Sequence, residues 1–122
     1  MSARRPRILY GVTGGIAAYK SPELVRRLVD RGFDVHCVLT HGARQFTTPL
    51  ALQTVSGNRV GVSLFDLTDE NEIGHVKLPE SADLFLVAPA SANILGKFAN
   101  GIADGLLETM FLVNRAPVLL AP

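Results

Sequence analysis

The fold is decided by the stretch Ile8-Leu9-Tyr10-Gly11-Val12-Thr13-Gly14-Gly15-Ile16-Ala17-Ala18-Tyr19-Lys20. A short apolar run ends in a glycine-rich turn, and a long amphipathic segment follows it directly. This order predicts a strand over residues 7–12, a tight turn, and a helix over about 15–31 that Gly32 ends as a C-cap. The first N–H groups of a helix lack partners within it, and the helix dipole is positive there. The stretch therefore predicts a phosphate-binding turn on an open α/β sheet.

The spacing of the glycines indicates which kind of nucleotide would supply the phosphate. Gly11-x-x-Gly14-Gly15 is not the G-x-G-x-x-G of dinucleotide-binding proteins, and the second strand does not end in an acidic residue that would hold a ribose. The ATP-binding loop G-x-x-x-x-G-K-[ST] is missed because Tyr19 stands where its second glycine belongs. Pro22 suits a first helical turn, so the helix can restart or bend at 21–23. A mononucleotide is the best candidate, while a turn that needs glycine only for its tightness stays open.

Length and composition predict one cytoplasmic domain. The chain has 122 residues, enough for a single core, and 48% of them are hydrophobic. A net charge of +1 argues against a nucleic-acid surface. No apolar run approaches the ~20 residues of a membrane span, and the N-terminus has no apolar signal segment. We expect residues 1–6 to form a disordered basic tail with Arg4, Arg5 and Arg7 in solvent, and Cys37 to be a core residue.

Strands and helical segments alternate along the chain, which predicts βαβ units with right-handed crossovers. The expected strands cover 34–40, 60–64, 84–88 and 116–122, and the expected later helices cover a short segment before Pro49 and then 50–55, 94–99 and 106–113. Residues 66–74 are typical of a surface loop. His36 is interpreted as a strand residue rather than a ligand. Phe46 is interpreted as core, with a planar platform at the crevice mouth as the alternative.

A second small-residue turn follows the most apolar strand. Leu84-Phe85-Leu86-Val87-Ala88 leads into Pro89-Ala90-Ser91-Ala92-Asn93, where Ser91 is a good N-cap for the next helix. In a doubly wound sheet, the turns after these two strands flank the point where the strand order reverses, and ligands bind there. We expect an α/β fold with a Rossmann-like (flavodoxin-like) open parallel sheet, helices on both faces, and a ligand site at that point.

Four motifs in order make the chain resemble a known family. They are Gly-Val-Thr-Gly-Gly-Ile-Ala-Ala-Tyr-Lys (11–20), Gly74-His75, Ala-Pro-Ala-Ser-Ala-Asn (88–93) and Ala-Asn-Gly-Ile-Ala-Asp (99–104). Over about 7–122 the chain resembles the flavin-dependent cysteine decarboxylases, and among them most of all the phosphopantothenoylcysteine decarboxylases of coenzyme A biosynthesis.

The resemblance implies an FMN-binding subunit that assembles as a homotrimer or a multiple of three, with no metal ion. His75 matches the active-site histidine of the family, and Phe46 matches a ring near the isoalloxazine. The other implied cofactor-binding residues lie in the two turns, at the end of strand two and in the loop at the cofactor and subunit interface: Gly14, Gly15, Ile16, Thr40, Ala90, Ser91, Ala92, Asn93, Asn100 and Asp104.

The implied reaction removes CO₂ from phosphopantothenoylcysteine. In this family FMN oxidises the thiol carbon toward a thioaldehyde, which acts as the electron sink for decarboxylation. The reduced flavin then converts the resulting enethiolate to the saturated thiol, 4'-phosphopantetheine. The cofactor supplies the electron chemistry and the protein supplies placement and proton handling. An imidazole such as that of His75 suits a general base or a carboxylate-orienting group.

The sequence departs from the family pattern at its end. The family continues past the last strand with Ala/Pro-Ala-Met-Asn, whose asparagine holds the substrate carboxylate, and later with a loop carrying a catalytic cysteine. Because this sequence stops at Pro122, we expect a flavoprotein domain truncated at its C-terminal end, with an incomplete substrate site. Three alternatives remain open: a flavin prenyltransferase, a peptide-cysteine decarboxylase and a non-catalytic flavin-binding subunit. The prenyltransferase is disfavoured because it lacks the histidine matched by His75 and commonly carries lysine at the position of Asn93.

Overall fold

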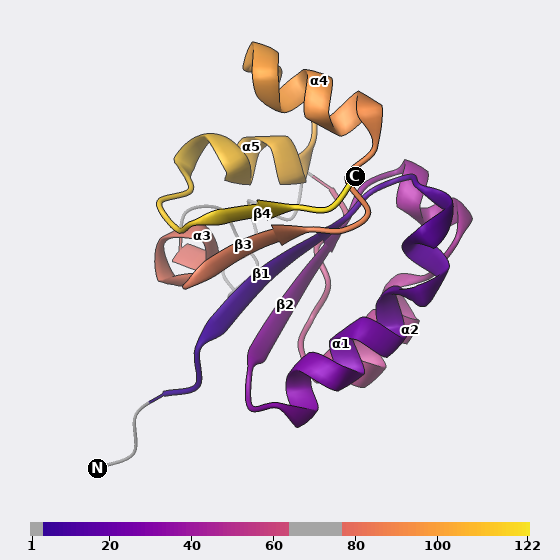
Figure 1. Ribbon diagram of the computed structural model, residues 1–122, viewed down its shortest axis with the longest axis vertical. Helices are drawn as coiled ribbons and strands as arrows, with labels where there is room; N and C mark the ends of the chain where they lie inside the picture. Colours follow the sequence, from indigo (N-terminus) through magenta and orange to yellow (C-terminus); the bar gives the residue numbers. More distant parts are fainter. Residues whose placement is uncertain (1–3, 64–76) are drawn as a thin grey trace.

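The computed structural model describes residues 4–63 and 77–122. Its centre is a parallel sheet of β1 (Arg7–Val12), β2 (Asp34–Leu39), β3 (Leu84–Val87) and β4 (Val118–Leu120), arranged in the order β2-β1-β3-β4 (Figure 1). The chain moves outward from β1 to β2 and then returns to the other side of β1 to form β3. The strand order therefore reverses between β1 and β3, as it does in flavodoxin-like sheets. This confirms the expected open parallel α/β fold.

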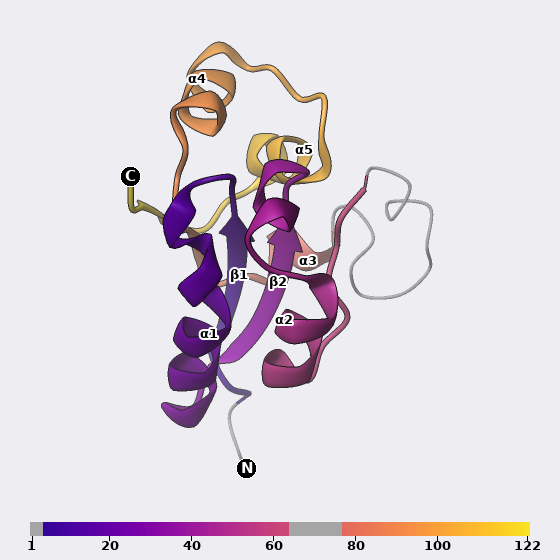
Figure 2. The ribbon, with the colours of Figure 1, turned by 90° about the vertical axis from the view of Figure 1, so that its right-hand side faces the viewer.

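Helices cover both faces of the sheet. The first set is η1 (Ile16–Lys20), α1 (Ser21–Asp30), η2 (Gly42–Gln45) and α2 (Pro49–Ser56), where η marks a 3₁₀ helix. The second set is α3 (Lys77–Ser81), α4 (Ala92–Asn100) and α5 (Leu106–Val113). Figures 1 and 2 show α1 and α2 together on one face, with α4 and α5 on the other.

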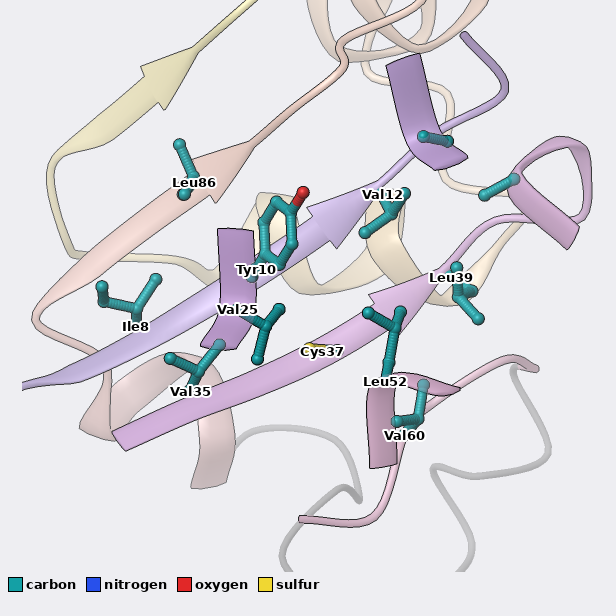
Figure 3. Close-up of a cluster of buried hydrophobic side chains, with 12 residues drawn as sticks. Ile8, Tyr10, Val12, Val25, Val35, Cys37, Leu39, Leu52, Val60 and Leu86 are labelled. Carbon is teal, nitrogen blue, oxygen red and sulfur yellow. The ribbon is translucent and has the colours of Figure 1, made fainter. Parts of the chain in front are cut away.

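Each strand divides its side chains between two cores. Alternate residues of a strand point to opposite faces of a sheet. Tyr10 of β1 and Cys37 of β2 therefore pack beneath α1 and α2 (Figure 3), while Leu9 and Val38 pack beneath α4 and α5. The expectation that Cys37 is a core residue is confirmed. His36 is a buried residue of β2, 2% exposed, as its interpretation as a strand residue requires.

The structure confirms the expected helix restart at 21–23 and corrects one expected strand. The long helix expected over 15–31 is η1 followed by α1, which begins at Ser21 with proline in its first turn. Pro22 lacks an N–H and is tolerated only where none is needed, so the α-helix restarts there. The strand expected over 60–64 is reduced to an isolated bridge between Val38 and Gly61 within the described part of that segment. The surface loop expected over 66–74 lies outside the described residues.

Arg4 and Arg5 are exposed as expected, whereas Arg7 is less solvated than expected. The Arg4 guanidinium contacts the Asp83 carboxylate at 3.0 Å and 3.2 Å. Arg7 belongs to β1, where its Nε lies 3.1 Å from Asp34 and its Nη1 donates to the Ser81 hydroxyl at 2.7 Å. The interpretation of Arg7 as part of a solvated tail is therefore wrong, because this side chain joins β1 to β2 and to the end of α3.

Candidate functional site

The turns after β1 and β3 are joined by one buried hydroxyl group. Thr13, 1% exposed, donates its hydroxyl hydrogen to the carbonyl of Pro89 and accepts the backbone N–H of Ser91 at 2.8 Å. Ser91 in turn caps α4 by accepting the N–H of Ile94 at 3.2 Å. The two turns expected to meet at the strand-order reversal are therefore hydrogen-bonded to each other.

Glycine is required in the first turn because the backbone segments there lie very close together. A Cβ atom on Gly14 would lie 3.2 Å from the Cα of Gly42, at the start of η2. A Cβ on Gly15 would lie 3.0 Å from both Cβ and Cγ of Pro89. The backbone of Gly42 cannot move aside for a Cβ atom on Gly14 as a flexible side chain could. The tightness of the turn is thus explained by packing, although an anion-binding role stays compatible with it.

The helix dipole after the first turn is weaker than expected. The helix that begins there, η1, has five residues and no side-chain cap, and α1 starts a full turn later. The second turn has the stronger helix start, because α4 has nine residues with Ser91 as its N-cap. Anion attraction by a helix N-terminus is therefore better supported at Ala92 and Asn93 than at Ile16.

A cavity of about 750 Å³ opens where the parallel strands end. Its walls come from the first turn, the end of β2 with η2, the start of α4 and the segment leading into α5. Five of the residues expected to bind the cofactor line it: Gly14, Thr40, Ser91, Asn93 and Asp104. The volume lies within the ~300–1,000 Å³ range of small-molecule sites.

The other expected site residues in the described part of the chain are absent from the lining of this cavity. Ile16 is 76% exposed, and Gly15 packs against Pro89. Ala90 is buried in the core beneath α4 and α5, while Ala92 is exposed in the first turn of α4. Asn100 ends α4, and its side-chain amide donates to the carbonyl of Gly96 at 2.8 Å.

Two of the expected residues need separate comment. Phe46 is 39% exposed, so its interpretation as a core residue is wrong. It follows η2 directly, and the bend of the chain there turns its ring outward rather than into the core beneath α1 and α2. Phe46 is absent from the described lining of the cavity, so the alternative of a platform near the crevice stays a prediction. His75 lies outside the described residues.

Sequence reasoning missed a charged cluster in the cavity wall. The Lys97 ammonium of α4 lies 2.9 Å from Asp104 Oδ1 and 3.4 Å from Glu108 Oε2 of α5. Burial raises the pKa of Glu108, and the hydrogen bond with Asp104 raises it further. The Lys97 ammonium, followed by the hydrogen bond from Glu108, lowers the pKa of Asp104. Of the two acids, Glu108 is therefore the one that holds a proton more readily.

The cysteine is not suited to nucleophilic chemistry. Cys37 is 1% exposed, and burial raises the pKa of its thiol to about 12. A thiol with such a pKa is protonated at neutral pH and is a poor nucleophile. In the described part of the chain, groups of His, Cys, Asp and Glu with the arrangement of a metal site are absent.

The comparison with known families decides which family this fold represents. The Flavoprotein family matches the chain over residues 1–122. The chain belongs to that family. It is also 50% identical over 116 residues to the coenzyme A biosynthesis bifunctional protein CoaBC of Vibrio cholerae serotype O1, an alignment that covers 95% of this chain and 29% of that protein. The chain thus spans about 30% of the length of the curated relatives it matches.

Solved structures give the same fold. The FMN-dependent cysteine decarboxylase SpaF matches 96% of this chain and 67% of its own, with a TM-score of 0.83 and 32% identity. A mutant of PPC decarboxylase matches 97% of this chain and 70% of its own, with a TM-score of 0.78 and 30% identity. The resemblance to the flavin-dependent cysteine decarboxylases, stated from four motifs, is therefore confirmed.

Proposed function

We propose that this domain binds FMN and uses it to decarboxylate 4'-phosphopantothenoylcysteine to 4'-phosphopantetheine in coenzyme A biosynthesis. The observation that carries the proposal is the cavity at the ends of β1 and β3, whose two turns are joined through Thr13. The similarity to a coenzyme A biosynthesis protein and to an FMN-dependent cysteine decarboxylase supports the choice of ligand and substrate.

The described residues fit a flavin mononucleotide. The cavity is large enough for a ligand of that size, and Gly14 lines it where the backbone of Gly42 leaves no room for a Cβ atom. The cap of α4 presents N–H groups and the positive end of a helix dipole beside Ser91 and Asn93, which suits a phosphate. The proposed cofactor contacts remain those expected from the sequence: Gly14, Gly15, Ile16, Thr40, Phe46, Ala90, Ser91, Ala92, Asn93, Asn100 and Asp104.

Bound FMN would supply the electron-accepting chemistry that makes the loss of CO₂ possible. The work of this chain is to place and shield the reacting groups. Thr13 fixes the distance between the two turns that border the site, and Leu106 and Leu107 give the cavity an apolar side. We assign the proton-handling or carboxylate-orienting role to His75, for which the resemblance is the support.

The cofactor proposal is tested by purifying the protein and identifying its bound chromophore. We expect visible flavin absorbance and release of FMN on denaturation; recovery of FAD or NAD would refute the proposal. Gly15→Asp should abolish binding, because its carboxylate would face the phosphate and its Cβ would meet Pro89 at 3.0 Å. Gly15→Ala separates the two causes, and Gly96→Asp is the control, since a Cβ at Gly96 has no described neighbour within 4 Å.

The reaction is tested by CO₂ release from phosphopantothenoylcysteine. His75→Asn should keep FMN but lower the rate by at least ~10²-fold, the lower range for a positioned acid–base group. Release from peptides ending in cysteine instead would favour a peptide-cysteine decarboxylase, and prenylation of the flavin would favour a prenyltransferase. These assays require a chain that continues through the asparagine motif and the cysteine loop of the family; bound FMN with no turnover of any of these substrates by that longer chain would indicate a non-catalytic flavin-binding subunit.

Assembly and location complete the proposal. No helix in the described ranges 4–63 and 77–122 is both long and apolar enough to cross a membrane. We propose a cytoplasmic protein that forms a homotrimer or a multiple of three, with the segment from Asn100 to Asp104 near the contact between subunits. Light scattering should give a mass that is a multiple of three chains, and a strictly monomeric mass with FMN bound would contradict this assembly.

A further inference from the structure

Three charged side chains stand together in one wall of the cavity. They are Lys97 of α4, Asp104 of the segment before α5, and Glu108 in the first turn of α5, and all three line the cavity. Lys97 contacts both acids, and each acid shifts the pKa of the other. The three groups therefore touch one another and form a compact polar patch, which we call the Lys97–Asp104–Glu108 patch.

The three side chains of the patch differ in their exposure to solvent. The side chain of Asp104 is 63% exposed, that of Lys97 is 25% exposed and that of Glu108 is 6% exposed. Gly105 makes room for the buried acid, because a Cβ there would lie 2.7 Å from Glu108 Oε2. The patch thus has a recessed floor, Glu108, beneath a carboxylate that a ligand can reach from the cavity.

The hydrogen-bonding capacity of the patch is specific. An ammonium group has three N–H donors, an ionised carboxylate only accepts, and a protonated carboxyl group donates one hydrogen. Two of the Lys97 donors meet the described carboxylates. Beyond these contacts Lys97 has a third donor, and the exposed Asp104 carboxylate has further acceptor sites, so the patch presents a donor and an acceptor side by side.

One part of a flavin is complementary to this set. The pyrimidine ring carries an imide edge, in which the N3–H donor stands between two carbonyl acceptors, C2=O and C4=O. A carboxylate can accept from N3–H while a neighbouring ammonium donates to one of the two carbonyl oxygens. The phosphate is the wrong group for this wall, because it would face the charge of Asp104, and it is better placed at the α4 N-terminus beside Ser91.

We propose that the Lys97–Asp104–Glu108 patch recognises the imide edge of the flavin ring, with Asp104 accepting from N3–H, Lys97 donating to a neighbouring carbonyl oxygen, and the buried Glu108 holding Lys97 in place. The inference rests on the proposed binding of FMN and names the wall of the cavity that recognises its ring. It also fixes the orientation of the ligand, because the imide edge then lies at the Lys97–Asp104–Glu108 patch and the phosphate at the N-terminus of α4. Bonds within the patch are exchanged for bonds to the ligand when the ring enters.

The test compares FMN with N3-methyl-FMN, which lacks the imide hydrogen. Both are titrated into the flavin-free protein, and dissociation constants are taken from quenching of flavin fluorescence. We expect N3-methyl-FMN to bind about 10- to 100-fold more weakly, the loss that corresponds to one hydrogen bond to a charged group. Asp104→Leu should weaken FMN by a similar factor and remove the difference between the two flavins, whereas Asp104→Asn, which keeps an acceptor oxygen, should preserve part of it.

Two further variants control the interpretation. Asp30→Leu removes a carboxylate of nearly equal exposure, 65%, which also pairs with a cation but lies on α1. It should leave both dissociation constants unchanged within about 3-fold. Glu108→Gln keeps the size of the side chain and an oxygen that can accept from Lys97, and it should also stay within about 3-fold; a loss above 10-fold would show that binding depends on Glu108 itself and would overturn the roles assigned within the patch.

The outcomes separate this inference from the function on which it rests. If the wild-type protein binds FMN and N3-methyl-FMN equally well, the imide assignment is wrong and the FMN proposal stands. If Asp104→Leu discriminates between the two flavins as the wild type does, Asp104 is not the acceptor. If the wild-type protein binds neither flavin, the proposed function fails and this inference falls with it.

Discussion

Replacing Thr13 by valine removes the hydroxyl that joins the two turns of the site while keeping the shape of the side chain. The variant loses the bond donated to Pro89 and the bond accepted from Ser91. A typical hydrogen bond contributes about 0.5–1.5 kcal/mol net, so two give ~1–3 kcal/mol. Pro89 and Ser91 are only half-buried, and water can partly satisfy the groups left behind. We therefore expect the free energy of unfolding to fall by about 1–2 kcal/mol.

Urea denaturation of the protein without flavin measures this loss directly, because the midpoint shifts while the slope stays constant if only stability has changed. The matched control is Thr54→Val on α2, where an exposed hydroxyl donates to the carbonyl of Leu50 within the same helix. That change should stay within about 0.5 kcal/mol, as surface substitutions usually do. If Thr13→Val is no more destabilised than Thr54→Val, Thr13 does not hold the two turns together.

Three further predictions concern other parts of the fold. Gly14→Ala should lower the free energy of unfolding, measured in urea, by ~1–3 kcal/mol, because its Cβ would meet the backbone of Gly42. The control Gly96→Ala in α4 should raise the free energy of unfolding by ~0.5–1 kcal/mol, and equal effects of the two changes would refute the steric argument. Phe98→Ala should lower the free energy of unfolding by about 2–4 kcal/mol, because the Phe98 ring stacks on Phe111 with 3.9 Å between the ring centroids and packs edge to face with Phe85. The control Leu112→Ala, at a side chain that is 57% exposed, should lower it by less than ~0.5 kcal/mol. An equally small loss in Phe98→Ala would show that the packing of α4 does not depend on this stack. Burial alone would raise the pKa of Asp34, but hydrogen bonds from Asn58, His36 and Arg7 outweigh it and hold the pKa below the ordinary 3.8, so the stability that Asp34 adds is complete above pH 3.8 and is lost as the pH falls further. Asp34→Asn should flatten the profile of unfolding free energy below that pH, and an unchanged acid limb would contradict the assignment.

The elements that sequence analysis located correctly were those with a strong local pattern. The apolar run 84–88 contains β3, Ser91 caps α4 as expected, and the helix expected over 106–113 matches α5. The bend at 21–23 was also visible, because proline has a fixed local effect. Local rules thus placed the sheet, its central strands and the two turns of the site.

The features that the sequence did not disclose depend on contacts between distant segments. The hydroxyl of Thr13 meets residues 76 and 78 positions later, so its neighbours provide no clue to its role. The contact of Lys97 with Glu108 crosses from one helix to the next, and neither residue belongs to a recognisable motif. Phe46 has the large apolar side chain that is typical of a core residue, but the exposure of its ring depends on how η2 ends.

Because the side chains of β1 pack into two cores, a change in the register of this strand disturbs both cores at once. Gly11 sits where Leu107 of α5 approaches so closely that a Cβ atom would lie 2.6 Å from its Cδ1 atom. A shift of β1 by one residue would bring Tyr10 or Val12 into that gap, and would at the same time pull a large side chain out of the core beneath α1 and α2. One inserted residue within 7–12 would therefore damage both sides of the sheet together, whereas one inserted at the exposed turn of Gly32 would leave every strand pairing in place.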